Sequence, residues 1–477
     1  MKKILILIVS MVVLFTGCMR TIPTTISQPE NIEPVKSKEN IPIDENGNKI
    51  VYIATDKNEY IPRDLFQAIN AFNELENGYI VQPVIYAKDV MGTNESGGLQ
   101  TADMRLQMDI MQEEKLDIVY DGAFTDISRY DILSEKGAFI DFYELLDGEN
   151  GISKSELNEH ILKLHENNGK LYQMPLYYAI ETLGGDVANV GSKENWTLDE
   201  LIEHWNAMPK GSFFCGEATK WIVYMDLIRG NLGSFVDYKN GKCNFDSDEF
   251  IKLLEFCNRF PDTAEKISTN WETKYFLDYC HFDGFDDFHL YITGANSLGS
   301  WSESGLKTTP HTFVGYPSEN GNGSFVDTQR NRYSICRNSK NKEGAWNFIS
   351  YLLSYDVQVN HELVYNSDDD ESHDENGFPI NVDAFNKLAD DQIRHQGESR
   401  VLSFSGTEVD IGYLTTEEYQ RLDEFIQSLN RMDAPVDSSV QKIIESEIDA
   451  YFSGERSAKE VANAIQGRVE ILFSERM

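Results

Sequence analysis

The organisation of this chain is decided by one apolar run, GKLYQMPLYYAIETL, which occupies residues 169–183. The run has an extended pattern, and Pro175 stands at its middle. Because proline has no backbone N–H to donate to a sheet, the run predicts one strand that leaves a sheet at Pro175 and another that enters a second sheet. Tyr177, Tyr178 and Glu181 follow at once, and these side chains suit the wall of a cleft. We therefore interpret the run as a hinge between two lobes.

Length and composition indicate a folded protein with more than one lobe. The 477 residues exceed what one hydrophobic core usually supports, so two or more lobes of roughly 100–200 residues each are expected. A hydrophobic content of 41% is ample for packed cores. The chain carries 42 basic and 79 acidic residues, a formal net charge of −37. Such a surface repels phosphate backbones and anionic lipid headgroups, which argues against nucleic acid and against a polybasic membrane contact.

The N-terminus predicts export and lipid attachment. Two lysines precede an apolar run from Ile4 to Phe15, and Thr16 and Gly17 stand directly before Cys18. This order describes a secretory signal peptide over residues 1–17. Small residues followed by cysteine resemble the bacterial lipobox, in which Cys18 becomes the lipidated first residue of the mature chain. The alternative is an ordinary signal peptide with a chance cysteine. We predict a lipoprotein on the outer face of a bacterial cell membrane, with a Gram-positive source favoured.

The segment 18–47 predicts a flexible, lipid-anchored tether. It is rich in Pro, Ser, Thr, Asn, Glu and Lys and has few large apolar side chains. Burial of so few apolar groups cannot offset the entropy lost on ordering. The tether lets the body sample the space above the membrane.

The remaining cysteines do not indicate a metal site. They are Cys215, Cys243, Cys257, Cys280 and Cys336. None has the CxxC or Cys/His spacing of a zinc site, and their odd number excludes complete internal pairing. We expect mostly buried free thiols, with one bridge among the first four left open. The acidic segment 367–374 resembles a calcium loop in composition only, because His373 and Pro379 would occupy its sixth and twelfth positions.

The first part of the body alternates between strands and helices. Apolar runs at 50–55, 80–86 and 116–121 predict strands, while helices are expected from Pro62 onward and around 98–114. This alternation implies a parallel sheet covered by helices, with ligands at the carboxyl ends of the strands.

Three polar residues fall at such ends, and we take them as candidate ligand contacts. Thr55 and Asp56 end the first strand, and Asp121 ends the third.

The later part of the chain carries clear helix starts. Capping boxes are predicted at 197–200, 415–418 and 457–460, each before an amphipathic run. Trp205 falls on the apolar face of the first of these helices, so we interpret it as a core residue rather than a ligand contact. A further helix is expected over 338–353.

The segment LGSWSESG at 298–305 predicts a binding loop. Trp301 stands among hydroxyl groups, glycines and the carboxylate of Glu303. An aromatic face that stacks on a ligand, with polar groups that orient it, fits this composition. The alternative is a tryptophan that covers the edge of the core.

Seven motifs occur in order between about residues 50 and 470. They are AINAFN (68–73), LDIV (116–119), KGAFIDF (136–142), GKLYQMP (169–175), WTLDE (196–200), GYP (315–317) and SKNKEGAWNFI (339–349). Together, behind a lipobox, they resemble the family 1 extracellular solute-binding proteins of ABC importers, the carbohydrate-binding group related in architecture to maltose-binding protein. The resemblance is specific to the family and says little about the ligand.

The resemblance implies an α/β, two-lobed periplasmic-binding-protein-like fold, type II-like, with the ligand cleft between the lobes. It implies three hinge crossings, near 170–176, 323–332 and 364–376. The N-terminal lobe would hold 48–171 and 326–365, and the C-terminal lobe 172–325 and 366–477. The implied ligand contacts are Thr55, Asp56 and Asp121 in one lobe, Tyr177 and Tyr178 beside the hinge, and Trp301 and Glu303 in the other.

The resemblance also implies a function, which is capture of a sugar or oligosaccharide and its delivery to the permease of an ABC importer. Pyranose rings have apolar faces that stack on Trp and Tyr, and their hydroxyls pair with carboxylates and amides. One departure is that the chain has Gly299-Ser300-Trp301 where many members have a glycine–proline turn.

Two other functions stay open. The first is an exported glycan-processing hydrolase, and ANSLG at 295–299 mimics a nucleophile elbow with alanine at its first position. No HExxH, GxxxxGK[ST] or GxGxxG motif is present, so no metal or nucleotide cofactor is predicted. The second is a lipid-anchored sensor or adhesion lipoprotein of the same fold, which the residues do not separate from a transport protein.

Overall fold

The computed structural model describes most of the chain after residue 40. It covers 41–476 apart from 56–60, 62, 87–94, 113–114, 122–127, 149–151, 193–194, 216–217, 239, 264–274, 294–310, 319–322, 328–331, 361–376, 405–406 and 433–436. Residues 1–40 form a separate unit outside this description, so the signal peptide and Cys18 stay predictions. At the end of the predicted tether the chain turns into the body, because the Asp44 carboxylate accepts the backbone N–H groups of Asn46 and Asn48. None of the helices in the described residues is long and apolar enough to cross a membrane.

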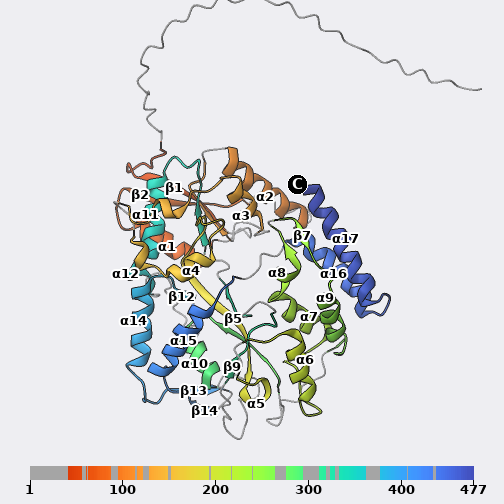
Figure 1. The fold of residues 1–477 in the computed structure, drawn as a ribbon. Helices are drawn as coiled ribbons and strands as arrows, with labels where there is room; N and C mark the ends of the chain where they lie inside the picture. Colours follow the sequence, from red (N-terminus) through yellow and green to blue (C-terminus); the bar gives the residue numbers. More distant parts are fainter. Residues whose placement is uncertain are drawn as a thin grey trace, which may run out of the picture. The chain divides into compact units, whose positions relative to one another are not determined.

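The first sheet has the strand order β2-β1-β3-β11-β4. Figure 1 labels β1 and β2 of this sheet. Its strands are β1 (Lys49–Ala54), β2 (Tyr79–Val84), β3 (Ile118–Tyr120), β4 (Met174–Pro175) and β11 (Arg332–Ile335). β1 pairs in parallel with β2 and β3, which confirms the parallel arrangement predicted for the first three strands. β11, however, is antiparallel to both β3 and β4. It differs because the chain enters β11 from the second sheet, at the edge where β3 and β4 end.

Helices cover this first sheet as the apolar spacing predicts. α1 (Arg63–Asn73) buries Leu65, Ile69 and Phe72, and α2 (Glu95–Gln112) buries Ala102, Leu106 and Ile110. The remaining helices of this part are α3 (Ser128–Glu135), α4 (Glu159–Leu164), α11 (Lys342–Leu353) and α12 (Tyr355–Val359), with short 3₁₀ turns at Phe142–Glu144 and Lys154–Glu156. α11 begins later than expected because Asn341 caps it, accepting the N–H of Gly344 at 3.1 Å.

The predicted change of sheet at Pro175 is confirmed. Pro175 pairs with Arg332 in the first sheet, and two residues later Tyr177 pairs with Pro379 in the second. Only Leu176 separates β4 from β5 (Tyr177–Asp186). The chain returns between β10 (Phe325–Asp327), which pairs with β5, and β11. The third predicted crossing, 364–376, lies outside the described residues.

The second sheet is built around β5. Four strands pair antiparallel with it, namely β8 (Asp278–Phe282), β9 (His311–Phe313), β10 and β12 (Phe378–Pro379). Two small strand pairs lie apart, β6 (Val236–Asp237) with β7 (Lys242–Cys243) and β13 (Val401–Phe404) with β14 (Thr407–Asp410).

Helices surround the second sheet. They are α5 (Val187–Val190), α6 (Leu198–Ala207), α7 (Lys220–Arg229), α8 (Leu232–Phe235), α9 (Asp248–Cys257), α10 (Phe285–Thr293), α14 (Val382–Ile393), α15 (Thr416–Ser428), α16 (Ser438–Phe452) and α17 (Ala458–Arg476). The capping boxes predicted at Thr197 and Thr415 are present. At Ser457 the side chain and backbone exchange hydrogen bonds with Glu460, as predicted.

Two large apolar cores divide the body. One runs without a break from α1 and α11 through Tyr177 and Tyr178 to α14 and α15, so it joins the two sheets. The other lies among α6, α7, α9, α16 and α17. Trp205 packs in this second core, 5.4 Å from Phe214 and 5.9 Å from Phe260 between ring centroids, which confirms its interpretation as a packing residue. The five cysteines after residue 40 are free thiols, so the bridge left open does not form.

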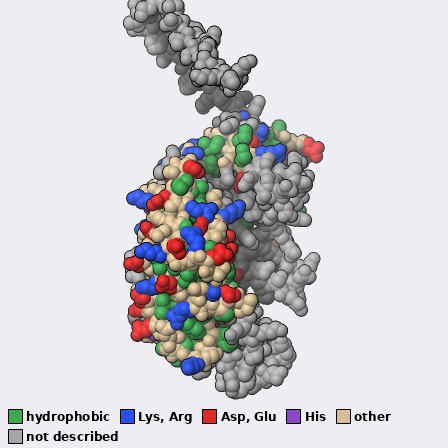
Figure 2. Space-filling model, turned by 90° about the vertical axis from the view of Figure 1, so that its right-hand side faces the viewer, with side chains coloured by type: hydrophobic (Ala, Val, Ile, Leu, Met, Phe, Trp, Pro, Cys, Tyr) green, Lys and Arg blue, Asp and Glu red, His purple; other side chains and the backbone are tan. Residues whose placement is uncertain are grey.

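The surface of the body mixes charges of both signs. On the face drawn in Figure 2, lysine and arginine side chains lie among aspartate and glutamate side chains across the described residues. This face therefore offers no continuous basic surface of the kind that a polyanion requires.

Candidate ligand-binding site

Polar side chains collect where the chain passes between the two sheets. β1 and β3 both end at one edge of the first sheet, and Thr55 and Asp121 follow them directly. Arg332 begins β11 beside the end of β3, and Pro175 ends β4 opposite Arg332. The structure thus brings Thr55 and Asp121 to the same sheet edge, as their positions in the sequence predict.

An ion pair lies at the centre of this edge. The Arg332 Nε donates to Asp121 Oδ2 at 3.1 Å, and Arg332 Nη1 donates to the Gln173 side-chain oxygen at 3.3 Å. Only 1% of the Asp121 side chain and 11% of the Arg332 side chain are exposed. Since opposite charges so close largely cancel, this pair gives the described part of the edge a neutral, strongly polar surface. Gln173 thereby ties the hinge run to the other strands of the sheet.

A neutral histidine lies near the pair. His165 Nδ1 lies 2.8 Å from the backbone oxygen of Ile161, which accepts a hydrogen bond from the ring. Burial lowers the pKa of His165 to about 3, and the positive charge of Arg332 acts in the same direction. The ring is therefore uncharged at neutral pH and adds no net charge to the edge.

Two buried polar atoms at this edge lack partners. Thr55 Oγ1 and Gln173 Nε2 have no hydrogen-bond partner within the described part of the protein. Burial of an unpaired hydroxyl or amide is unfavourable by about 1–3 kcal/mol. Such atoms are rare in folded proteins, and a bound polar molecule is one way to satisfy them. A hydroxyl and an amide beside a neutral ion pair fit a ligand rich in hydroxyl groups.

The other candidates from the sequence divide into two groups. Tyr177 and Tyr178 are 3% and 1% exposed and belong to the core that joins the sheets, where the Tyr178 ring packs 5.6 Å from Phe378. Asp56, Trp301 and Glu303 lie outside the described residues, as does the elbow-like segment 295–299. The edge therefore unites Thr55 and Asp121, whereas the tyrosines pack behind it.

Sequence reasoning missed Arg332 and Gln173. Gln173 lies inside the hinge run, two residues before Pro175, and this closeness to the predicted change of sheet was the signal that could have marked it as a site residue. Arg332 is the first residue of β11, and only the antiparallel pairing of β11 with β3 brings it beside Asp121. Within the described part of the chain, no group of three or more His, Cys, Asp or Glu side chains is placed to hold a metal ion.

Two sheets joined at one edge, with polar residues at the junction, define a two-lobed α/β fold of the periplasmic-binding-protein kind. No protein-family model and no curated protein matches the sequence. Solved structures do match, and they confirm at the level of fold the resemblance to family 1 extracellular solute-binding proteins.

Three of these structures span nearly the whole chain. A family 1 extracellular solute-binding protein from Alicyclobacillus acidocaldarius has 13% identity and a TM-score of 0.52, over 90% of this chain and all of the other. A periplasmic oligogalacturonide binding protein from Yersinia enterocolitica has 15% identity and a TM-score of 0.53, over 89% and 99%. A de novo designed cysteine esterase has 15% identity and a TM-score of 0.53, over 90% and 99%. At such identities the likeness concerns the fold alone.

Proposed function

We propose that this protein is the substrate-binding lipoprotein of an ABC importer and that it captures a sugar or oligosaccharide between its two lobes. The observation that carries the proposal is the polar sheet edge, where Thr55 Oγ1 and Gln173 Nε2 are buried without partners beside the Asp121–Arg332 pair. That edge lies at the junction of the two sheets, where a fold of this kind closes on its ligand.

The chemistry of the edge favours a neutral polyol over a charged solute. A neutral ligand exchanges hydrogen bonds with Thr55 and Gln173 without disturbing the ion pair. A strongly charged ligand would compete for Asp121 or Arg332 and would leave the other charge buried without its partner. Of the solved structures with this fold, one is described as a solute-binding protein and another as an oligogalacturonide binding protein, which supports a sugar as the ligand class. Because galacturonate units carry carboxylates, the preference for a neutral sugar rests on the ion pair alone.

Attachment and delivery rest on the sequence. The lipobox at Cys18 and the tether to residue 47 support a protein fixed to the outer face of the membrane. In this proposal the tether holds the body near a permease, which receives the ligand, and the ligand contacts of the facing lobe include Trp301 and Glu303. Tyr177 and Tyr178 would support the hinge from its core side.

A thermal-shift screen with a panel of neutral sugars and oligosaccharides tests the proposal. A ligand that binds only the folded state stabilises it by mass action and so raises the melting temperature. At a ligand concentration a hundred-fold above Kd, the gain in unfolding free energy is about 2.7 kcal/mol. We expect at least one sugar to produce a shift. If no glycan shifts the transition and a peptide, metal chelate or polyamine does, the sugar proposal is wrong.

A pair of near-isosteric variants ties the effect to the sheet edge. Thr55→Val removes a hydroxyl that has no partner, so the ligand-free protein should gain about 1–3 kcal/mol while sugar affinity falls about five- to ten-fold. Thr182→Val is the matched control, because its hydroxyl lies 2.7 Å from that of Ser324 in the second sheet. This control should lose about 1 kcal/mol of stability and keep its sugar affinity. Unchanged affinity in Thr55→Val would remove Thr55 from the site.

A further inference from the structure

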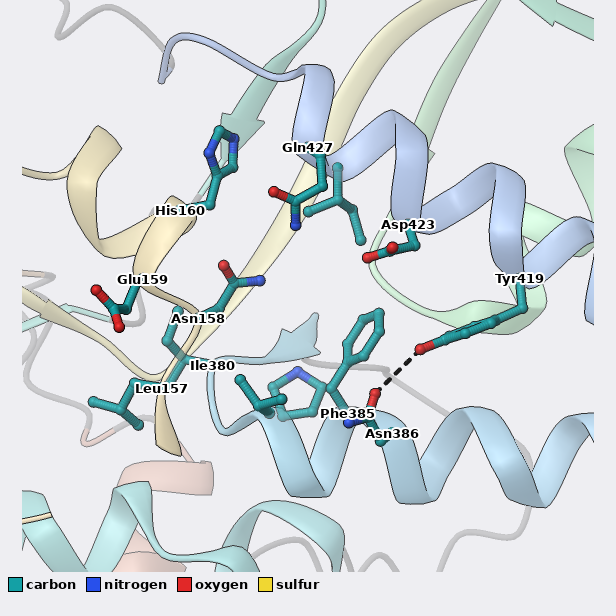
Figure 3. Close-up of a pocket in the computed structure, with 13 residues that line it drawn as sticks. Leu157, Asn158, Glu159, His160, Ile380, Phe385, Asn386, Tyr419, Asp423 and Gln427 are labelled. Carbon is teal, nitrogen blue, oxygen red and sulfur yellow. Dashed lines mark hydrogen bonds between the residues drawn. The ribbon is translucent and has the colours of Figure 1, made fainter. Parts of the chain in front are cut away.

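A second pocket lies on the core side of the hinge. Its volume is about 250 Å³, and it is bordered by α4, β12, α14 and α15 (Figure 3). Its floor is apolar and buried, formed by Leu157, Ile380, Phe385 and Ile426. No residue of the sheet edge with Thr55 and Asp121 lines this pocket, so it is a separate site.

The rim of the pocket is rich in hydrogen-bond acceptors. Figure 3 shows the Asp423 carboxylate and the Gln427 amide directed into the pocket, whereas the Glu159 carboxylate points away from its centre. The Tyr419 hydroxyl donates to Asn386 Oδ1 at 3.1 Å, so its oxygen can still accept a hydrogen bond. Among the thirteen residues that line the pocket there is neither a lysine nor an arginine.

The one histidine that lines the pocket has a backbone partner outside it. His160 Nε2 lies 2.8 Å from the backbone oxygen of Leu429, which accepts a hydrogen bond from the ring. The pocket therefore combines a carboxylate and amide oxygens with an apolar floor.

A buried hydroxyl lies beside the same pocket. The Tyr178 side chain is 1% exposed, and its Oη forms no hydrogen bond of ordinary geometry within the described residues. Asp423 and Tyr419, which line the pocket, interact electrostatically with this phenol, and the Asn158 amide, which also lines the pocket, lies near it. Burial is the main reason that the pKa of Tyr178 lies far above its usual value, so the hydroxyl stays neutral and its oxygen keeps lone pairs that can accept a hydrogen bond. A buried hydroxyl without a partner next to a cavity is a second sign that the cavity receives a polar molecule.

We propose that this pocket binds a small organic cation, a primary ammonium on a short aliphatic stem. The ammonium group would lie at Asp423 and the oxygens of Gln427 and Tyr419, where a charge-assisted hydrogen bond forms. The stem would cover the apolar floor, and the rings of Phe385 and Tyr419, 6.3 Å apart, would offer their faces to the cation. The net charge of −37 raises the local concentration of any cation near the protein.

Calorimetric titration of the full-length chain with n-butylammonium tests this assignment. Two matched probes separate its parts: 1-butanol has the stem without the charge, and ammonium ion has the charge without the stem. We expect n-butylammonium to bind at least ten-fold more tightly than either probe. Equal binding of n-butylammonium and 1-butanol, or no binding of n-butylammonium, would overturn the proposal.

A pair of charge variants on one helix locates the site. Asp423→Asn should weaken n-butylammonium binding about ten-fold or more, because it removes the carboxylate that faces the pocket. Glu424→Gln removes the same charge from the neighbouring position of α15, which does not line the pocket, and should change binding less than two-fold. Equal effects of the two variants would mean that the cation follows net charge alone. Both variants should keep the thermal shift with sugar, so this test fails independently of the sugar proposal.

Discussion

The return of the chain to β5 depends on one glycine, and this dependence gives a sharp test of the fold. Gly377 precedes β12 and has a φ of +103°, which side chains with a Cβ rarely adopt. A Cβ at this position would lie 2.7 Å from the Tyr178 backbone oxygen and 3.0 Å from its carbonyl carbon. Backbone atoms of a central strand cannot move aside easily, so β12 itself would have to shift.

Two unfavourable effects add in Gly377→Ala. The positive φ is unfavourable by about 1–2 kcal/mol for an L-residue. The contact with β5 adds overpacking of about 1–3 kcal/mol, since a shift of β12 also loosens the Phe378–Tyr178 ring pair. A smaller opposing effect is the reduced entropy of the unfolded alanine chain, about 0.4–1 kcal/mol. We expect a net loss of roughly 1–4 kcal/mol of unfolding free energy, the sum of these three effects.

Gly397→Ala isolates the contact from the conformational effect. Gly397 has a φ of +86°, and a Cβ there would meet nothing within 4 Å. Conformational strain and unfolded-state entropy are therefore similar in both variants, and their difference measures the contact of β12 with β5. Urea unfolding followed by far-ultraviolet circular dichroism should give a loss about 1–3 kcal/mol larger for Gly377→Ala. Equal losses would refute the tight packing of β12 against Tyr178.

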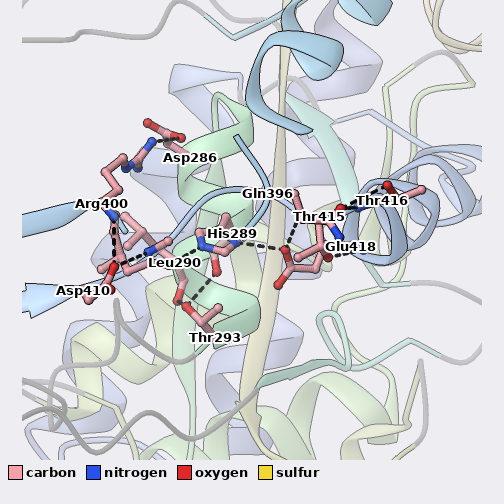
Figure 4. A network of polar contacts seen from close by, with 12 residues as sticks. Asp286, His289, Leu290, Thr293, Gln396, Arg400, Asp410, Thr415, Thr416 and Glu418 are labelled. Carbon is pink, nitrogen blue, oxygen red and sulfur yellow. Dashed lines mark hydrogen bonds and ion pairs between the residues drawn. The ribbon is translucent and has the colours of Figure 1, made fainter. Parts of the chain in front are cut away.

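Two further predictions concern polar groups in the core. His289 is buried between Glu418 Oε2 at 3.0 Å and the Ile411 oxygen at 2.6 Å (Figure 4). Burial opposes its charge, but these two hydrogen bonds outweigh it and raise the pKa of His289 above its ordinary 6.5. The stabilisation by the charged ring is complete below pH 6.5 and is lost as the pH rises through the raised pKa. In urea unfolding, the difference in unfolding free energy between wild type and His289→Gln should therefore shrink between about pH 5.5 and about pH 8.5. A difference that stays constant would contradict the charged pair. Asn341→Ala should lower the unfolding free energy by about 2–4 kcal/mol, because Asn341 caps α11 and its Nδ2 donates to the Ile50 oxygen at 3.0 Å. The control Asn338→Ala, at an exposed position, should lower it by under about 0.5 kcal/mol. Similar losses in urea unfolding of the two variants would contradict the cap.

The fold was largely predictable because its signals are local. Pro175 removes a donor from the sheet, and this single chemical fact locates the passage from β4 to β5 to within two residues. Thr197 and Thr415 start helices by capping them, which needs no knowledge of the rest of the chain. The direction of β11 was not predictable, because it depends on where the chain returns from the second sheet. That is a property of the topology and leaves no mark on residues 332–335 themselves.

The candidate site was predictable only in part, for the same reason. The rule that ligands lie at the ends of parallel strands is enough to select Thr55 and Asp121. This rule does not select Arg332, because an antiparallel strand brings it to the site. It does not select Gln173 either, because in the sequence Gln173 is one polar residue within the apolar hinge run. The tyrosines show the opposite limit. Tyr177 and Tyr178 have the composition of a sugar platform, but in the structure they lie 3% and 1% exposed in the core.

The motifs that carry the family resemblance do structural work, and this explains why they say so little about the ligand. The Asp141 carboxylate of KGAFIDF accepts the backbone N–H of Leu171 at 3.0 Å, and Leu171 lies near the start of the hinge run. Trp196 of WTLDE donates to the oxygen of Gly315 in GYP at 2.8 Å.

The same holds for LDIV and SKNKEGAWNFI. Asp117 Oδ1 accepts the Ser339 hydroxyl at 2.6 Å, and Asp117 Oδ2 accepts the N–H of Tyr52 at 2.8 Å. These contacts hold strands and loops in place behind the sheet edge, and a protein can keep them all while its ligand changes. Thr55 and Gln173 differ from Asp117, Asp141 and Trp196 because each keeps one buried polar atom without a hydrogen-bond partner among the described residues. Gln173 belongs to the motif GKLYQMP and binds Arg332 through its side-chain oxygen, but its Nε2 stays unpaired. Ligand identity should therefore respond to Thr55 and Gln173, whereas replacement of Asp117, Asp141 or Trp196 should lower stability for every ligand alike.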